Sequence, residues 1–215
     1  MNLMNYNLSM LSSSPCTLYL VRHGETLWNA KKVLQGHTDI PLNATGEAQA
    51  RARGESLKDI HFDAVYSSDL IRAKRTAEII TLERNLAITT TQALRERNFG
   101  TLEGKHSDVH NVYLLNLLAH YNSHPELKEA QLETNDRIIA RVFTFLREIS
   151  IAHQGESVLV ASHGGVIRQV LIHLGFAVES QLPAGSIQNT AYIKLACDGV
   201  DFWIMNTVGI ELAKE

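Results

Sequence analysis

Two short apolar segments, each followed immediately by His-Gly, constrain the fold of this chain more than any other feature. Residues 17–22 (TLYLVR) precede His23, and residues 157–162 (SVLVAS) precede His163. Short apolar runs that end in glycine-containing turns are typical of buried β-strands. The carboxyl ends of parallel strands are also where α/β proteins bind their ligands. We therefore expect both histidines at one edge of a parallel sheet, where the adjacent glycines allow a ligand to approach the backbone closely.

The rest of the chain alternates between strand-like and helix-like segments. Further strands are expected at residues 64–68 and 86–91, and two half-exposed strands joined by a turn at 189–196 and 201–206. Apolar residues recur with helical spacing at 44–57, 70–80, 135–151 and 166–174. Strands that alternate with helices predict an α/β protein with three layers, α/β/α. Its central sheet is expected to be mostly parallel, with one antiparallel edge strand and helices on both faces.

Polar residues and a glycine mark the expected ends of these helices. We expect Thr45 and Thr134 to be the N-caps of the first and third helices, and Asp69 to open the second. The fourth helix is expected to stop at Gly175, because glycine readily adopts the left-handed conformation that ends many helices.

The composition of the 215-residue chain is that of an ordinary folded protein, with 45% hydrophobic and 20% charged residues. At roughly 150 residues per domain, this length favours one domain with a substantial insertion. We expect a mobile tail over residues 1–15 and a single domain over residues 16–215. The less regular segment at 105–131 is expected to be a helical insertion or lid.

Charge and cysteine content exclude several classes of partner. The formal net charge is −3 and no long basic run occurs, so nucleic acid is not an expected partner. No apolar run reaches the roughly 18 residues of a transmembrane helix, so we expect no membrane contact. Cys16 and Cys197 are too few for a disulfide framework, which favours a reduced, cytoplasmic protein. A homodimer is compatible with these features.

Two imidazoles and an arginine at one edge of the sheet would form a compact anion site. Arg22 directly precedes His23, and His163 is expected beside them. A single His-Gly pair is equally compatible with a structural histidine, but both pairs together with Arg22 favour a ligand site. The ligand is expected to be a small anion, since the charge of a pocket can oppose the net charge of the protein.

Five blocks in order extend this pattern: LVRHGETLWN, QGHTDIPLNATGEAQA, VYSSDLIRAKRTAEII, LRERNFGTLEG and VLVASHGGVIRQVL. Together they resemble the histidine phosphatase superfamily, and within it the phosphoglycerate-mutase-like phosphatase branch. The resemblance runs from Thr17 to Leu174, and the final strands also fit. It implies a phosphoglycerate-mutase-like fold and the hydrolysis of a small-molecule phosphate ester.

The resemblance also implies a role for each matching residue. His23 matches the nucleophile that becomes phosphohistidine, and His163 matches the second histidine of the site. Arg22 and Arg72 match the two arginines that bind phosphate, and Glu96 matches the proton donor. Further residues are expected to line the phosphate pocket: Asn29, Gln35, Gly36 and Gly164.

The physical chemistry of phosphoryl transfer agrees with these roles. A phosphomonoester is nearly a dianion at neutral pH, and two guanidinium groups can each hold two of its oxygens. The dianion should favour protonated His163, whereas the attacking nitrogen of His23 must be unprotonated, with its other nitrogen held by an acceptor such as a backbone carbonyl. Glu96 would protonate the leaving oxygen and later deprotonate water. The alternative for Glu96 is an ion pair with Arg95 or Arg97.

Two other histidine pairs have the one-turn spacing of zinc ligands. They are His106 with His110, and His120 with His124. No third ligand is evident beside them, so we expect exposed helix histidines rather than a metal site. We expect no metal ion and no cofactor.

The choice between hydrolysis and transfer depends on a basic clamp. Mutases of this superfamily hold a second phosphate with a basic pair on an insertion, whereas no arginine occurs here between Arg97 and Arg137. Hydrolysis is therefore favoured, and mutase-type phosphoryl transfer and a non-catalytic phospho-ligand binding module are the alternatives. Residues 132–134 are Leu-Glu-Thr, where family members often have Gly-Glu-Ser. This difference leaves open which contacts form on the side of the expected lid.

Overall fold

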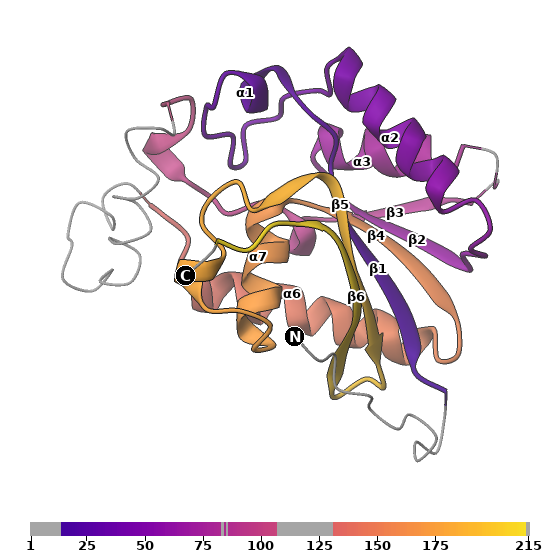
Figure 1. Cartoon of the computed structure of the whole chain (residues 1–215). Coiled ribbons are helices and arrows are strands. Elements are labelled where there is room, and N and C mark those ends of the chain that lie inside the picture. The colour runs from indigo at the N-terminus through magenta and orange to yellow at the C-terminus, as the bar shows by residue number, and fades with distance from the viewer. Residues whose placement is uncertain (1–13, 83, 85, 107–130, 214–215) are drawn as a thin grey trace.

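The computed structural model describes residues 14–82, 84, 86–106 and 131–213. These residues form a six-stranded sheet in the order β3-β2-β4-β1-β5-β6, with helices on both faces (Figure 1). The strands are β1 (Cys16–Arg22), β2 (Ala64–Ser68), β3 (Ile88–Thr91), β4 (Ser157–Ser162), β5 (Ile187–Cys197) and β6 (Phe202–Ile210). The helices are α1 (Leu27–Ala30), α2 (Ala44–Ser56), α3 (Ile71–Ile80), α6 (Asn135–Ala152) and α7 (Gly164–His173).

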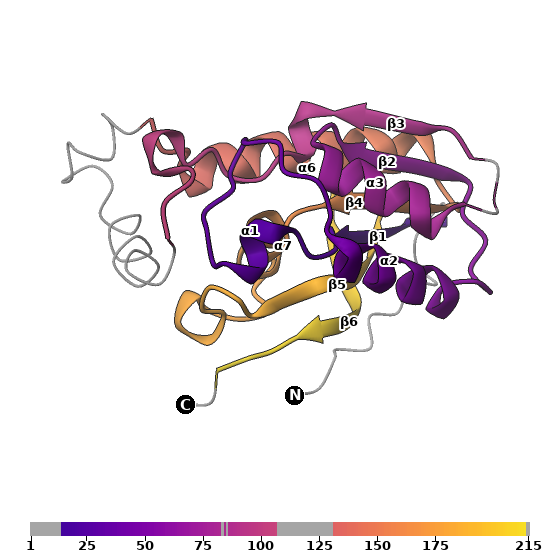
Figure 2. The ribbon, with the colours of Figure 1, turned by 90° about the horizontal axis from the view of Figure 1, so that it is seen from above.

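The expected fold class is confirmed. Strands β3, β2, β4 and β1 pair in parallel, and Figure 2 shows them side by side with α2 and α3 on one side. Antiparallel pairing is confined to one edge of the sheet, where β5 pairs with β1 and with β6. The architecture is therefore a three-layer α/β fold with a mostly parallel sheet.

The register of β1 against β4 brings the two His-Gly segments together. Leu18 lies opposite Val158, and Arg22 lies opposite Ser162 at the carboxyl end of both strands. The amide of His23 continues the ladder by donating to the carbonyl of Ser162 (3.0 Å). Because the strands are parallel and end at the same level, both histidines emerge at one edge of the sheet.

Alternating side chains of β1 contribute to two separate cores. Leu18 and Leu20 pack in the larger cluster with residues of α6 and α7, while Tyr19 and Val21 pack in a second cluster on the side of α2 and α3. Successive side chains of a strand point to opposite faces, so a fully apolar strand must be covered on both. This double coverage makes the sheet a rigid base for the residues at its edge.

The helix ends differ in part from the expectations. Thr134 caps α6 as expected, but the N-cap of α2 is Asn43, whose side chain accepts from the amide of Gly46 (2.8 Å), and not Thr45. A residue must lie outside the helix to cap it, and Thr45 is already inside α2. Asp69 does not cap α3, because its carboxylate binds the guanidinium of Arg95 instead (2.6 and 2.8 Å).

Most of the expected tail and insertion fall outside the described residues. Of residues 1–15 only 14 and 15 are described, and of residues 105–131 only the two ends. Within the described ranges, none of the helices combines the length and the apolarity needed to cross a membrane.

The packing predicts that β4 carries much of the stability of the fold. Leu159 is fully buried in the cluster on the α2 and α3 side, so Leu159→Ala should lower the free energy of unfolding by about 2–5 kcal/mol. Urea unfolding measures this change. Val200→Ala is the control, since Val200 is 66% exposed, and it should leave the free energy nearly unchanged. Equal effects of the two substitutions would contradict this account of the core.

Candidate active site

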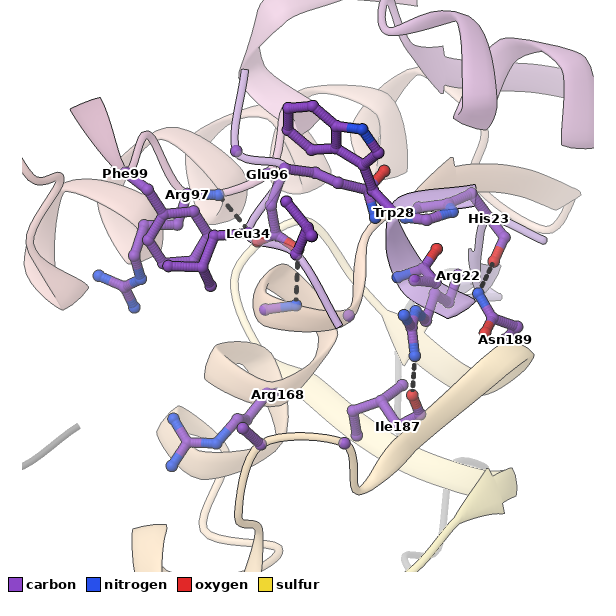
Figure 3. A pocket seen from close by; sticks show the side chains of 18 of the residues that line it. Arg22, His23, Trp28, Leu34, Glu96, Arg97, Phe99, Arg168, Ile187 and Asn189 are labelled. Carbon is purple, nitrogen blue, oxygen red and sulfur yellow. Dashed lines mark hydrogen bonds between the residues drawn. The ribbon is translucent and has the colours of Figure 1, made fainter. Parts of the chain in front are cut away.

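A cavity of about 480 Å³ opens at the carboxyl edge of the sheet, above the ends of β1 and β4 (Figure 3). Its walls come from the end of β1, the segment 28–36, α3, residues 96–99, the start of α7 and residues 183–189. Eight residues predicted from the sequence line it: Arg22, His23, Asn29, Gln35, Gly36, Arg72, Glu96 and Gly164. His163 lies just behind this wall, with its ring centroid 5.2 Å from that of His23.

His23 is held on both its ring and its backbone. Its Nδ1 lies 2.7 Å from the carbonyl oxygen of Gly24, and because a carbonyl only accepts, Nδ1 carries the proton. This leaves the lone pair of the ring on Nε2, and a backbone carbonyl is the kind of acceptor expected from the sequence for the other ring nitrogen. The carbonyl of His23 accepts from Nδ2 of Asn189 (3.1 Å) and from the amide of Thr190 (3.3 Å). The nucleophile expected from the sequence is therefore fixed in one tautomer.

The surroundings of His23 also keep its ring neutral. Burial lowers the pKa of His23 well below its usual value, and the positive charges of Arg72 and Arg22 lower it further. A neutral imidazole with an unprotonated Nε2 is the form that can attack phosphorus.

Arg72 is buried and Arg22 is half-buried, and each guanidinium group has an unused donor. Arg72 donates to the carbonyls of Thr38 (3.0 Å) and Gly36 (2.7 Å), and Arg22 donates to the carbonyl of Ile187. The Nε of each arginine is buried without a hydrogen-bond partner. Burial lowers the pKa of Arg72 to about 10, so its charge persists at neutral pH. Such donors are costly to leave unpaired, and an anion in the cavity would pair them.

His163 completes the polar wall with two further unpartnered atoms. Both ring nitrogens are buried and make no hydrogen bond within the described residues. Burial, followed by the charge of Arg72, lowers the pKa of His163 well below its usual value. Without a ligand His163 is therefore neutral, and only an anion beside it would favour the protonated form expected from the sequence.

The carboxylate of Glu96 is held by backbone amides rather than by an arginine. Its Oε1 accepts from the amide of Arg97 (2.8 Å), and its Oε2 accepts from the amide of Gly165 (3.0 Å). A Cβ at position 165 would lie 2.3 Å from Oε1, so this close approach requires glycine. The alternative of an ion pair with Arg95 or Arg97 is not what the structure shows, since Arg95 binds Asp69.

Several further residues line the cavity although no pattern in the sequence indicated them: Trp28, Arg97, Phe99, Arg168, Ile187 and Asn189. Arg168 lies on α7 and Asn189 lies on β5, and both positions were fully accounted for by helix and strand patterns. No signal in the sequence distinguished Asn189, because its role depends on a bulge in β5. At this bulge Thr190 has a φ of 57°, which is rare for a β-branched residue.

The histidine pairs considered as zinc ligands cannot be placed in full. His110, His120 and His124 lie outside the described residues, and His106 is exposed. Across residues 14–106 and 131–213, apart from positions 83 and 85, no group of three or more His, Cys, Asp or Glu side chains is arranged to hold a metal ion.

Comparison with known proteins identifies the family. The family model of the histidine phosphatase superfamily (branch 1) matches residues 18–208. The chain belongs to this superfamily. Relatives include the uncharacterized phosphatase PhoE of Bacillus subtilis, 39% identical over 155 residues, which cover 72% of this chain and 75% of PhoE. The probable phosphoglycerate mutase GpmB of Citrobacter koseri is 33% identical over 208 residues, covering 89% of this chain and 92% of GpmB.

A solved structure shows the same fold. Bacillus stearothermophilus YhfR superimposes with a TM-score of 0.76 at 30% identity, over 91% of this chain and 97% of YhfR. The names of the relatives divide between phosphatase and mutase, so membership of the superfamily leaves the fate of the phosphoryl group to be argued from the site.

The buried histidines predict how stability depends on pH. The unfolded chain binds protons on His163 below about pH 6.5, whereas the folded protein does not, so stability is lost as the pH falls below that value. Between pH 7 and pH 5, the melting temperature of His163→Asn should therefore fall less than that of the wild type. Thermal unfolding at the two pH values measures this difference.

A surface histidine provides the matched control. The side chain of His61 is 86% exposed and pairs with Asp63 only at the surface (3.2 Å), so His61→Asn should change the dependence on pH far less than His163→Asn does. Inorganic phosphate should raise the melting temperature of the wild type, because it binds the folded state through the unpaired donors. An identical loss in His163→Asn and the wild type would contradict the burial of a neutral ring.

Proposed function

We propose that this protein is a phosphatase that hydrolyses small-molecule phosphomonoesters through a phosphohistidine on His23, without a metal ion. The observation that carries the proposal is the set of buried donors without partners around His23. These are Nε of Arg22, Nε of Arg72 and the ring of His163. In this proposal they would bind the oxygens of a phosphoryl group, whose transfer depends mainly on positioning and charge neutralisation.

In the first half-reaction, Nε2 of His23 attacks phosphorus with its lone pair. The bond from phosphorus to the ester oxygen breaks, and the leaving oxygen takes the proton of the Glu96 carboxylic acid. In the second half-reaction, Glu96 removes a proton from water as the water oxygen attacks the phosphohistidine. The bond from nitrogen to phosphorus then breaks, and inorganic phosphate leaves while His23 regains its lone pair.

Hydrolysis is proposed over transfer to a second acceptor site because the unpartnered buried donors around His23 belong to Arg22, Arg72 and His163 and not to the arginines of the outer wall. Arg97 and Arg168 line the cavity, but each guanidinium already holds protein oxygens. Arg97 donates to the carbonyl of Glu133 (2.5 Å) and the side chain of Asn135 (2.6 Å), and Arg168 donates to the carbonyl of Leu182 (2.5 Å). These arginines organise the wall, and a substrate with one phosphate meets the donors around His23.

The first test is the hydrolysis of p-nitrophenyl phosphate with and without EDTA. His23→Ala should lower the rate by on the order of 10³-fold or more, because the nucleophile is lost, and EDTA should change nothing. The control is His61→Ala, which removes an exposed histidine far from the cavity wall and should keep full activity. Activity in His23→Ala would overturn the nucleophile, and inhibition by EDTA would overturn the metal-free mechanism.

The product that the protein forms from a phosphorylated hydroxy acid distinguishes hydrolysis from phosphoryl transfer. With 3-phosphoglycerate as the probe, ³¹P NMR should show free phosphate and no isomer of the substrate. Formation of the isomer would make the protein a mutase, and binding of phosphate without any turnover would make it a phospho-ligand binding module.

Glu96 is tested by varying the leaving group. Glu96→Gln should slow the hydrolysis of alkyl phosphates by roughly 10²- to 10⁴-fold, because an alkoxide leaves poorly without a proton. It should slow p-nitrophenyl phosphate far less, since p-nitrophenolate leaves without help. Equal slowing of both esters would argue against Glu96 as the acid.

A further inference from the structure

Residues 93–98 form the segment that carries Glu96. Side chains that do not line the cavity hold this segment by hydrogen bonds. We propose that Arg141 of α6, itself held by Glu133, is a positioning residue that sets the location of the Glu96 carboxyl group. This inference rests on the proposed function, in which Glu96 exchanges protons with the leaving oxygen and with water.

The planar guanidinium group of Arg141 donates hydrogen bonds to two backbone carbonyls of this segment. Its Nη1 donates to the carbonyl of Ala93 (2.7 Å), and its Nη2 donates to the carbonyl of Glu96 (3.2 Å). The other edge of the guanidinium binds both carboxylate oxygens of Glu133, at 2.7 Å from Nε and 2.9 Å from Nη2. All three nitrogens are therefore used, in the rigid geometry that only arginine provides.

Glu133 links this guanidinium to the far end of the same segment. Its amide donates to the carbonyl of Asn98 (2.9 Å), and its Oε2 accepts from the amide of Asn98 (3.2 Å). Burial alone would raise the pKa of Glu133, but the hydrogen bond and charge of Arg141 hold that pKa below its usual value. Glu133 is thus an anion at neutral pH and keeps Arg141 in place.

The side chain of His37 also binds the carbonyl of Glu96. Nε2 of His37 lies 2.9 Å from this oxygen, and the amide of His37 is in turn bound to Glu103 (2.8 Å). The Glu96 carbonyl thus has two donors, Arg141 and His37, while its carboxylate has two backbone donors of its own. Glu96 cannot shift without breaking several of these bonds, and a displacement of about 1 Å at a catalytic group can cost on the order of 10²-fold in rate.

The charge of Arg141 also reaches His163, whose pKa it lowers. A substitution that tests the positioning role must therefore keep the positive charge at position 141 and remove the planar guanidinium group. Arg141→Lys does so, and it leaves Glu133 with a cationic partner, so the variant is expected to fold. Arg137→Ala is the matched control, because Arg137 is an exposed arginine one turn earlier on α6.

The test compares an alkyl phosphate, glycerol phosphate, with p-nitrophenyl phosphate. Arg141→Lys should lower kcat for glycerol phosphate by on the order of 10²-fold, because Glu96 is displaced, and change kcat for p-nitrophenyl phosphate far less. The affinity for inorganic phosphate should stay unchanged, and Arg137→Ala should behave as the wild type. A lower melting temperature with an unchanged ratio of the two rates would overturn the proposal, since it would show a purely structural role.

A double variant decides whether Arg141 acts through Glu96. In the background of Glu96→Gln, adding Arg141→Lys should cause no further loss, because the group being positioned is already removed. Losses that multiply would overturn the proposal. If Glu96→Gln alone shows no dependence on the leaving group, the acid role of Glu96 within the proposed function fails. If it does and Arg141→Lys does not, only the role of Arg141 fails.

Discussion

The withdrawal of two guanidinium groups from water beside His23, that of Arg72 completely and that of Arg22 in part, is the constraint on which the rest of the site depends. A charge removed from water is costly unless it is hydrogen bonded. Backbone carbonyls meet this need, from Ile187 for Arg22 and from Gly36 and Thr38 for Arg72. A carbonyl orients a cation without neutralising it, so the full positive charge remains available to an anion. A carboxylate in the same place would have occupied the site with a permanent counter-ion.

Two residues beside the cavity, Gly36 and Thr190, have a left-handed backbone conformation. Gly36 has a φ of 52°, and a Cβ there would lie 2.1 Å from the Glu103 carboxylate that ties this loop together. In β5, the bulge with Thr190 in a left-handed conformation directs its amide to the carbonyl of His23. The carbonyl of Thr190 is held by Nε of Arg53 from α2 (2.8 Å). The strained backbone of Thr190 thus binds the carbonyl of His23, and Arg53 supports it.

The sequence predicted what depends on local pattern, and it failed where distant segments meet. The strands and the convergence of His23 with His163 follow from apolar runs and parallel pairing, so they could be predicted. The N-cap of α2 was misplaced because Thr45 and Asn43 are both good caps, and only the course of the preceding loop selects Asn43. The contact of Glu96 with the amide of Gly165 joins positions 69 residues apart. Its role came from the resemblance to the superfamily, and its geometry only from the structure.

In the proposed function, a nucleophilic His23 and a bound phosphate place opposite demands on one small volume, and the same arginines meet both. A nucleophilic His23 must be neutral, and the charges of Arg72 and Arg22 contribute to that by lowering its pKa. Phosphate needs concentrated positive charge, which the same two groups provide. His163 shares this environment and is neutral until an anion arrives. In the proposed function, the dianion itself makes protonation of His163 favourable, so the third cation appears only when there is charge for it to neutralise.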